Sequence, residues 1–185
     1  MYDKSQVYMP AEDTFLLRDV ACAEVTPEDV VLEMGTGSGE IAAAVMKTAS
    51  RTLACDINPH AVSYAHAVHG LDTVQSDMFS AVSGRFSLIL FNAPYLPTEP
   101  GERMDDWLEY ALDGGIDGRN SVSRFLAEAP GHLTENGRIL LLISSLTGLK
   151  EVIKMAETNG CSAETVASER EEDGEYLYVL KIVKN

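Results

Sequence analysis

Short apolar runs alternate with helical patterns along this chain, and this alternation constrains the fold more than any other feature. The runs are too short for helices and too continuously apolar for half-exposed strands, which is typical of strands buried on both faces of a parallel sheet. Together they predict a doubly wound α/β fold. Helices are expected at residues 39–49, 59–69, 119–131 and 147–159. Strands are expected at Val30–Leu32, Thr52–Cys55, Leu71–Gln75, Phe86–Phe91, Ile139–Ile143 and Tyr176–Val183.

The C-terminal stretch departs from strict alternation. Between Cys161 and Val183, two strand-like runs flank an acidic segment that ends at Gly174, which indicates an antiparallel hairpin. We therefore expect a mostly parallel seven-stranded sheet with helices on both faces and this hairpin at its end. That arrangement resembles Rossmann-like class I methyltransferases rather than dinucleotide dehydrogenases.

A second departure is the stretch from residue 96 to residue 118, which is rich in proline and glycine and allows a short helix at Asp105–Leu112. A connection this long, placed directly after a strand end, is expected to be functional. At the front of the chain, proline and acidic residues at 10–13 open a helix. Its apolar face is predicted at Phe15, Leu16, Val20 and Ala21.

Charge disfavours nucleic acid as a partner. Twenty-nine acidic and fourteen basic residues give a formal net charge of −15, and no cluster of lysine and arginine interrupts this acidity. Such a surface repels phosphate backbones. The sequence contains no uninterrupted stretch of about 18 apolar residues, so we expect no membrane span and predict a cytoplasmic protein.

Metal and disulfide chemistry are not indicated either. Cys22, Cys55 and Cys161 are far apart and odd in number, so they are expected to be buried thiols rather than a disulfide framework or a zinc site. His66 and His69 share one helix face without a carboxylate or thiol at metal-ligand spacing. We expect no metal site.

A glycine-rich loop follows the first strand. Glu33, Gly35 and Gly37 lead to a helix that opens near Gly39, and the absence of Cβ atoms lets a ligand approach the backbone there. The same segment also fits a plain structural turn. The dinucleotide fingerprint needs a small residue where Glu40 stands, so an adenosine ligand with a sulfonium and no phosphates fits the loop better.

Two further strand ends carry acidic residues. Asp56 follows the second strand about 20 residues after the loop, where a carboxylate can accept both ribose hydroxyls. A helix N-cap is the alternative interpretation of this residue. Asp77 and Met78 follow the third strand and could hold the adenine, although they fit a surface turn almost equally well.

The segment Asn92-Ala93-Pro94-Tyr95 closes the fourth strand and is the most informative motif. A conjugated amide or amino nitrogen is a poor nucleophile, because its lone pair is delocalised. The Asn92 side-chain oxygen and the Ala93 carbonyl could hold its two N–H groups, while Pro94 fixes the loop and Tyr95 packs on the flat group. Alignment and electrostatics would then supply the rate. An Asn-x-Pro turn without a catalytic role is the alternative.

Five segments in one order span nearly the whole chain and resemble the HemK family of release-factor glutamine N5-methyltransferases, specifically its short eukaryotic and archaeal branch. They are Val7–Thr14, Glu33–Gly39, Asp56–Pro59, Asn92–Tyr95 and Gly114–Arg119. The resemblance implies one catalytic domain over residues 1–185, S-adenosylmethionine as methyl donor and S-adenosylhomocysteine as product. The implied substrate is the Gly-Gly-Gln glutamine of a class 1 peptide-release factor.

The resemblance also implies roles for individual residues. Residues 1–24 would cover the cofactor and residues 96–118 would form the substrate loop. A small zinc-binding activator subunit would dock on the edge strand Leu71–Ser76. The implied cofactor residues are Thr14, Glu33, Gly35, Gly37, Asp56, Asp77, Met78 and Asn92, and the implied catalytic residues are Asn92, Ala93, Pro94 and Tyr95.

Several alternatives stay open on the sequence alone. The family usually has proline where Ala93 stands, so this loop has one φ restraint fewer. The same motif serves adenine-N6 and cytosine-N4 methyltransferases, although the acidity argues against a nucleic-acid substrate. A non-catalytic interaction module is the rival of another class. Trp107 and Tyr110 fit either a local core or a platform for the substrate.

Overall fold

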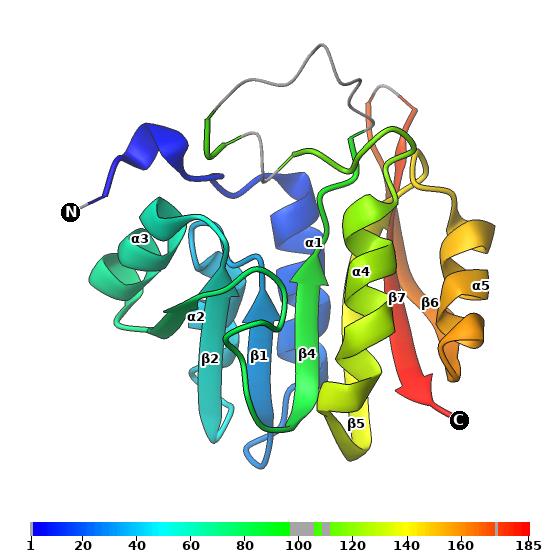
Figure 1. Ribbon diagram of the computed structural model, residues 1–185, viewed down its shortest axis with the longest axis horizontal. Coiled ribbons are helices and arrows are strands. Elements are labelled where there is room, and N and C mark those ends of the chain that lie inside the picture. The colour runs from blue at the N-terminus through cyan, green and yellow to red at the C-terminus, as the bar shows by residue number, and fades with distance from the viewer. Residues whose placement is uncertain (1, 97–105, 109–111, 173) are drawn as a thin grey trace.

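The computed structural model describes residues 2–96, 106–108, 112–172 and 174–185, which form a seven-stranded sheet with helices on both faces (Figure 1). The strand order is β3-β2-β1-β4-β5-β7-β6, parallel from β3 to β5 and antiparallel at β7 and β6. The predicted fold class and C-terminal hairpin are confirmed. The strands are β1 (Val30–Met34), β2 (Arg51–Asp56), β3 (Asp72–Gln75), β4 (Phe86–Asn92), β5 (Leu133–Ser144), β6 (Cys161–Arg170) and β7 (Tyr176–Lys184). The helices are η1 (Lys4–Gln6), α1 (Glu12–Glu24), α2 (Glu40–Val45), α3 (Pro59–His69), α4 (Asn120–Glu128), η3 (Ala129–His132) and α5 (Leu149–Thr158).

Some element boundaries differ from the predicted ones. Helix α2 ends at Val45 because the chain tightens into turns in which Thr48 N–H bonds back to the Val45 carbonyl. Helix α4 gives way to the η3 turn just before Pro130, whose ring is incompatible with a helix interior. Strand β5 starts six residues earlier than expected, because its first half pairs with β4 across a register irregularity. The possible helix at 105–112 lies largely outside the described residues.

Each face of the sheet has its own apolar core. Side chains of α4 and α5 pack on one face, together with inward residues of the central strands. Helices α1 and α2 pack on the other face, and α3 joins α2 there through a small cluster of alanines and Leu71. Because both faces are covered, the apolar runs at 31–32, 88–91 and 139–143 are buried, as their continuous apolar character predicted. Polar side chains are therefore left for the strand ends.

The predicted apolar face of α1 is partly wrong. Leu17 and Ala21 are fully buried, whereas Phe15 is 42% exposed beneath the guanidinium of Arg18. The buried face of this helix begins with Asp13, a polar residue. An apolar pattern cannot indicate such a face, because burial at its first turn is set by hydrogen-bond partners rather than by hydrophobicity.

Other expectations about single residues are also resolved. Cys55 and Cys161 are buried, but Cys22 is exposed on α1, so the expectation of three buried thiols is wrong for it. Gly174 has a φ of 93° and donates to the Glu171 carbonyl in the hairpin turn. None of the helices in the described ranges combines the length and apolar character that a bilayer crossing requires. The same ranges contain no cluster of three or more metal-binding side chains.

An ion cluster joins four elements at the amino-terminal edge of the parallel strands. Arg138 of β5 binds both carboxylate oxygens of Asp29, at 3.0 and 2.9 Å, and also pairs with Glu24 at the end of α1. Lys181 of β7 completes the cluster by binding Glu24. Burial alone would raise the pKa of Asp29, but hydrogen bonds from Arg138, Ser87 and Thr26 lower it below its usual value.

We expect Arg138→Ala to lower the free energy of unfolding at pH 7 by about 3 kcal/mol, because it leaves the Asp29 carboxylate buried without its partner. Asp29 has a lowered pKa in the folded state. Its stabilising effect is therefore complete above the ordinary value of about 3.9 and is lost as the pH falls below it. Urea denaturation from pH 7 to pH 3 should show the difference between the two proteins shrinking below about pH 5. Arg51→Ala, at an exposed arginine, should change stability by less than about 0.5 kcal/mol; a similar loss there would contradict this explanation.

Candidate functional site

One pocket of about 470 Å³ opens at the carboxyl ends of the parallel strands. It lies where β1 and β4 are neighbours although β2 and β3 intervene in the chain, which is the switch point where open α/β sheets bind ligands. All the residues proposed for cofactor or substrate from the sequence line this pocket. They are Thr14, Glu33, Gly35, Gly37, Asp56, Asp77, Met78, Asn92, Ala93, Pro94 and Tyr95.

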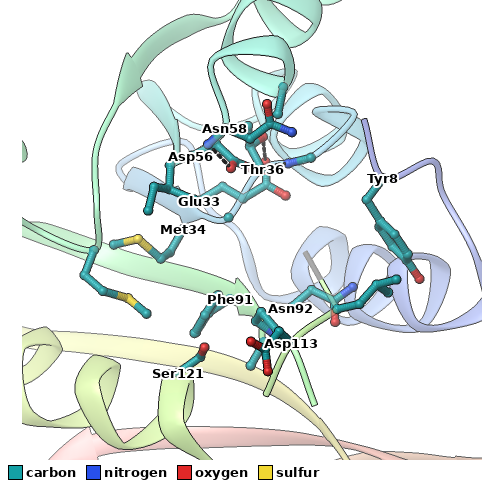
Figure 2. A pocket seen from close by; sticks show the side chains of 18 of the residues that line it. Tyr8, Glu33, Met34, Thr36, Asp56, Asn58, Phe91, Asn92, Asp113 and Ser121 are labelled. Carbon is teal, nitrogen blue, oxygen red and sulfur yellow. Dashed lines mark hydrogen bonds between the residues drawn. The ribbon is translucent and has the colours of Figure 1, made fainter. Parts of the chain in front are cut away.

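The end of β1 places a buried carboxyl group under the glycine loop. Glu33 is 2% exposed and lies beside Thr36 in the pocket (Figure 2). It accepts hydrogen bonds from the Thr36 hydroxyl and from the Ala42 backbone N–H, the latter at 3.1 Å. Burial raises the pKa of Glu33 to about 8, because the two hydrogen bonds compensate only partly and the charge of Asp56 adds to the rise. The group is therefore largely a neutral acid near pH 7.

Asp56, at the end of β2, binds the backbone of the glycine-rich loop. Gly37 N–H donates to Asp56 Oδ2 at 2.9 Å, and Asn58 N–H donates to Asp56 Oδ1 at the same distance. Burial raises the pKa of Asp56 despite these bonds. Because a carboxylate already occupies Gly37 N–H, this amide is not available to a phosphate. Asn58 caps α3 instead of Asp56, since its side chain accepts from His60 N–H at 2.8 Å.

The residues proposed for adenine lie between β3 and α4. Met78 has a φ of 48°, the one described non-glycine residue with a left-handed backbone, so this turn is strained. The Arg124 guanidinium of α4 donates to both oxygens of Asp77, at 2.9 and 3.0 Å. The sequence analysis did not identify Arg124. Glu40 pairs with Arg18 at 3.2 Å and does not line the pocket.

The end of β4 brings Asn92 to a carboxylate from the first turn of α1. Asn92 Nδ2 donates to Asp13 Oδ2 at 3.0 Å, and the Tyr8 hydroxyl donates to the same carboxylate at 3.0 and 3.2 Å. Asn92 Oδ1 is buried, and within the described ranges it has no hydrogen-bond donor. Figure 2 shows Tyr8 and Asn92 on the side of the pocket opposite Glu33 and Asp56. The sequence did not indicate the role of Asp13, because its partner Asn92 lies 79 residues further along the chain, and Tyr8 is linked to Asn92 through Asp13.

The next residue of the Asn92-Ala93-Pro94-Tyr95 segment is hydrogen-bonded to β5. Ala93 N–H donates to the Leu142 carbonyl at 3.4 Å, a bond that the usual proline could not make. With alanine at position 93, the loop therefore lacks the φ restraint of proline but gains a weak backbone hydrogen bond. Tyr95 is half-buried, and burial, with the charge of Asp13 adding to it, raises the pKa of its hydroxyl. The phenol therefore stays protonated at neutral pH.

The second glycine motif packs directly against this loop. Leu96 N–H donates to the Leu112 carbonyl at 3.2 Å, and Gly114 N–H donates to the Leu96 carbonyl at 2.9 Å. A Cβ atom at Gly114 would lie 3.0 Å from the Pro94 carbonyl oxygen and 2.7 Å from Gly118 Cα. Glycine is therefore required at 114 for close approach, rather than for a positive φ.

Trp107 also reaches the pocket. It is half-buried, lines the cavity, and its backbone N–H donates to the Gln6 side chain at 3.0 Å. The described part of the long connection therefore contacts the N-terminal segment across the pocket. The sequence left open whether Trp107 serves a local core or faces a ligand, and the structure places it at the cavity. Tyr110 lies outside the described residues.

Acidic side chains outnumber basic ones around the pocket. Five acidic side chains line it, and Arg124 is the one lysine or arginine among the described lining residues. Since Arg124 is paired with Asp77, it does not offset the other acids. A cationic ligand is therefore favoured over an anionic one. The acidic side chains are Asp13, Glu33, Asp56, Asp77 and Asp113.

Comparison with solved structures defines the class of protein. A chain in the structure of the E. cuniculi Mtq2–Trm112 complex, described as responsible for methylation of the eRF1 translation termination factor, matches with a TM-score of 0.80. It is 27% identical and the match covers 97% of this chain and 99% of that one. A ribosomal protein L11 methylase from Lactobacillus delbrueckii subsp. bulgaricus shares the fold at 20% identity and a TM-score of 0.70, covering 97% of this chain and 82% of that one. The fold is that of class I methyltransferases.

Sequence relatives identify the family. A Methanocaldococcus jannaschii protein, MJ0928, provisionally assigned as a protein N5-glutamine methyltransferase, is 43% identical over 88% of this chain and 84% of its own length. Homo sapiens methyltransferase HEMK2 is 33% identical over 98% of this chain and 91% of its own length. Comparison with protein-family models gave no match. The chain belongs to the HemK family of protein glutamine N5-methyltransferases.

We expect Glu33→Gln to change how stability depends on pH. The carboxyl ionises at about 4.3 in the unfolded chain but only near 8 in the folded one. Wild-type stability should therefore fall relative to the glutamine variant as the pH rises from about 4.3 to 8, by on the order of 4 kcal/mol at pH 8. Glutamine keeps an oxygen for the Thr36 and Ala42 bonds, so the variant should fold. Urea denaturation at pH 5 and pH 8 measures the difference, with Glu28→Gln at an exposed position as control. Parallel curves for the two Glu33 forms would show that Glu33 is already ionised when folded.

Proposed function

We propose that this protein transfers a methyl group from S-adenosylmethionine to the amide nitrogen of a glutamine side chain, and that this glutamine lies in the Gly-Gly-Gln loop of a class 1 peptide-release factor. The observation that carries the proposal is Asn92 Oδ1, a buried acceptor in the pocket with no donor among the described residues. A buried acceptor without a partner costs free energy unless a ligand supplies the hydrogen. The target N–H group would supply it.

The pocket suits S-adenosylmethionine better than a phosphate-bearing nucleotide. It is rich in carboxylates, and Gly37 N–H is already bound by Asp56. When bound, this cofactor supplies an electrophilic methyl group on a positively charged sulfonium. We assign the methionine portion to Thr14, Glu33 and the glycine loop at Gly35 and Gly37. We assign the ribose to Asp56, whose oxygens each retain a free acceptor direction.

Adenine would lie between the β3 end and α4. We assign its exocyclic amine to Asp77 and its flat face to Met78. Arg124, which also lines the pocket, donates to both Asp77 oxygens and holds that carboxylate in place. Each carboxylate oxygen can accept more than one hydrogen bond, so this contact leaves room for the amine.

On the substrate side, the chain's own residues position a planar nitrogen. Asn92 Oδ1 and the Ala93 carbonyl would each accept one N–H hydrogen of the glutamine amide, which directs the remaining lone pair toward the methyl group. Tyr95 would pack on the amide plane, and Pro94 holds the loop against Gly114. The nitrogen then forms one bond to carbon. The methylated nitrogen carries a positive charge and releases one proton to solvent, so the two neutral acceptors need not remove it beforehand.

The choice of glutamine rather than a nucleobase rests on the relatives and on charge. MJ0928 carries protein N5-glutamine methyltransferase in its name, and the Mtq2 complex is described as methylating the eRF1 translation termination factor. The net charge of −15 opposes a nucleic-acid substrate. Release factors act on cytoplasmic ribosomes, so we place the reaction in the cytoplasm. We also assign residues 96–118 to substrate binding, since the described part of this stretch lines the pocket.

A small activator subunit is part of the proposal. Mtq2 is paired with Trm112 in its structure, and β3 forms one edge of the sheet here, hydrogen-bonded to β2 on its inner side. We propose that a zinc-binding partner of the Trm112 kind docks along β3. Methyl transfer should therefore be measured with and without that partner.

Methyl transfer from radiolabelled S-adenosylmethionine to a release factor tests the function directly. Label should enter the unaltered factor, and not the factor whose loop glutamine is changed to alanine. A mixed DNA and RNA sample is the parallel substrate. Label in nucleic acid alone would replace glutamine with an exocyclic amine as the target. Cofactor binding without any transfer, even with the partner present, would contradict the assigned substrate.

We expect Asn92→Ala to lower kcat roughly 100- to 1000-fold, since it removes a preorganised polar group that orients the reacting nitrogen. Cofactor affinity should change little, because the side chain faces the substrate half of the pocket. Single-turnover transfer and equilibrium binding of S-adenosylhomocysteine measure the two quantities. Asn159→Ala, at the exposed end of α5, is the control and should leave both unchanged. Loss of cofactor affinity at Asn92→Ala would show that Asn92 serves the cofactor.

A further inference from the structure

We propose that Asp13 is a positioning residue that selects which end of the Asn92 amide faces the substrate. The inference rests on the proposed function, in which Asn92 must present an acceptor to the glutamine N–H group. Asp13 lies in the first turn of α1 at the wall of the pocket, and its carboxylate accepts a hydrogen bond from Asn92 Nδ2 at 3.0 Å. Asp13 would therefore act through Asn92 without touching the reacting atoms.

An asparagine side chain needs such a selector. Its oxygen and its NH2 group have nearly the same shape, so hydrogen-bond partners decide which of the two points in a given direction. The carboxylate of Asp13 offers acceptors and no donor. It can therefore bind only the NH2 end of Asn92, and the geometry of the amide then turns Oδ1 to the opposite side, where it is buried and without a partner in the described structure.

Asp13 is itself held firmly. Asp13 is only 4% exposed. Its Oδ1 accepts hydrogen bonds from the Thr14 backbone N–H at 2.6 Å and from the Thr14 hydroxyl at 3.1 Å. The Tyr8 hydroxyl spans both oxygens. Burial raises the pKa of Tyr8, so that hydroxyl remains a donor at all physiological pH values. A carboxylate in the first turn of a helix is also favoured by the helix dipole.

The consequence of losing the selector follows from these contacts. In Asp13→Asn, the new amide must keep its oxygen toward the Thr14 N–H, so its NH2 group points at Asn92. Asn92 then turns its oxygen to that NH2 group and presents its own NH2 group to the pocket. The NH2 group of Asn92 and the N–H group of the substrate amide, both donors, would then face each other. We therefore expect kcat to fall roughly 100-fold while cofactor affinity stays unchanged.

A reciprocal exchange provides the decisive test. Asn92→Asp alone sets two carboxylates against each other and should also lose activity. In the double variant Asp13→Asn with Asn92→Asp, the amide at position 13 donates to the carboxylate at position 92, which still has an acceptor oxygen for the substrate. The double variant should be at least about 10-fold more active than either single variant. A merely structural role for Asp13 predicts no such recovery.

The experiment measures kcat, KM for the release factor and the dissociation constant of S-adenosylhomocysteine for all four proteins, with the activator subunit present. Asp19→Asn, an exposed acid on the same helix, is the matched control and should behave as wild type. Wild-type kcat in Asp13→Asn would overturn the proposal. So would a double variant that folds and binds cofactor but is no more active than the single variants.

A second measurement separates this inference from the proposed substrate. Nitrogen-15 NMR follows the Asn92 side-chain NH2 group without any turnover. In wild type these protons should exchange slowly with solvent, because one is bound to Asp13 and buried, and in Asp13→Asn their shift and exchange should change. If wild type shows the protected signal but methylates no release factor, the substrate assignment fails and the positioning role stands. An unprotected signal in wild type would overturn the positioning role itself.

Discussion

Burial of the parallel strands on both faces is the constraint on which the rest of this structure depends. Helices cover both sides of β1 and β4, so the middle of each strand is apolar and polar side chains lie toward the strand ends. Glu33, near the end of β1, satisfies its carboxyl group within the loop that follows, and Asn92 closes β4 beside the pocket. The same rule puts Asp56 at the end of β2. Site chemistry therefore collects at one edge of the sheet because the core excludes it elsewhere.

The ion cluster at the opposite edge has a different consequence. Arg138 and its carboxylate partners fix the end of α1 to β1, β5 and β7. The other end of α1 carries Asp13 into the pocket. A helix held at one end by ion pairs and packed through Leu17 and Ala21 along its length presents its first turn in a defined place. Stability at the base of the sheet and order in the site are thus linked through one rigid helix.

Electrostatics in the pocket distinguishes two carboxyl groups that look alike in the sequence. Burial raises the pKa of both groups, and Glu33 is thereby largely neutral near pH 7. Asp56 accepts the Gly37 N–H group, an amide that a phosphate would otherwise use. The acidity of the chain as a whole points the same way. Only the folded structure shows that five of the acidic side chains line a single cavity.

The sequence by itself determined the order of strands and helices, the C-terminal hairpin and the residues at the strand ends, because apolar period, glycine position and strand-end polarity are local properties. It also carried the family resemblance, since motifs such as Glu33–Gly39 and Asn92–Tyr95 are contiguous. It did not reveal the exposure of Phe15, the pairing of Arg124 with Asp77, or the contact of Asp13 with Asn92. Those depend on which distant segments meet when the sheet closes, and hydrogen bonding across 79 residues leaves no period in the chain. Tertiary structure alone decided how the amide of Asn92 is turned, because the partner that turns it belongs to another element.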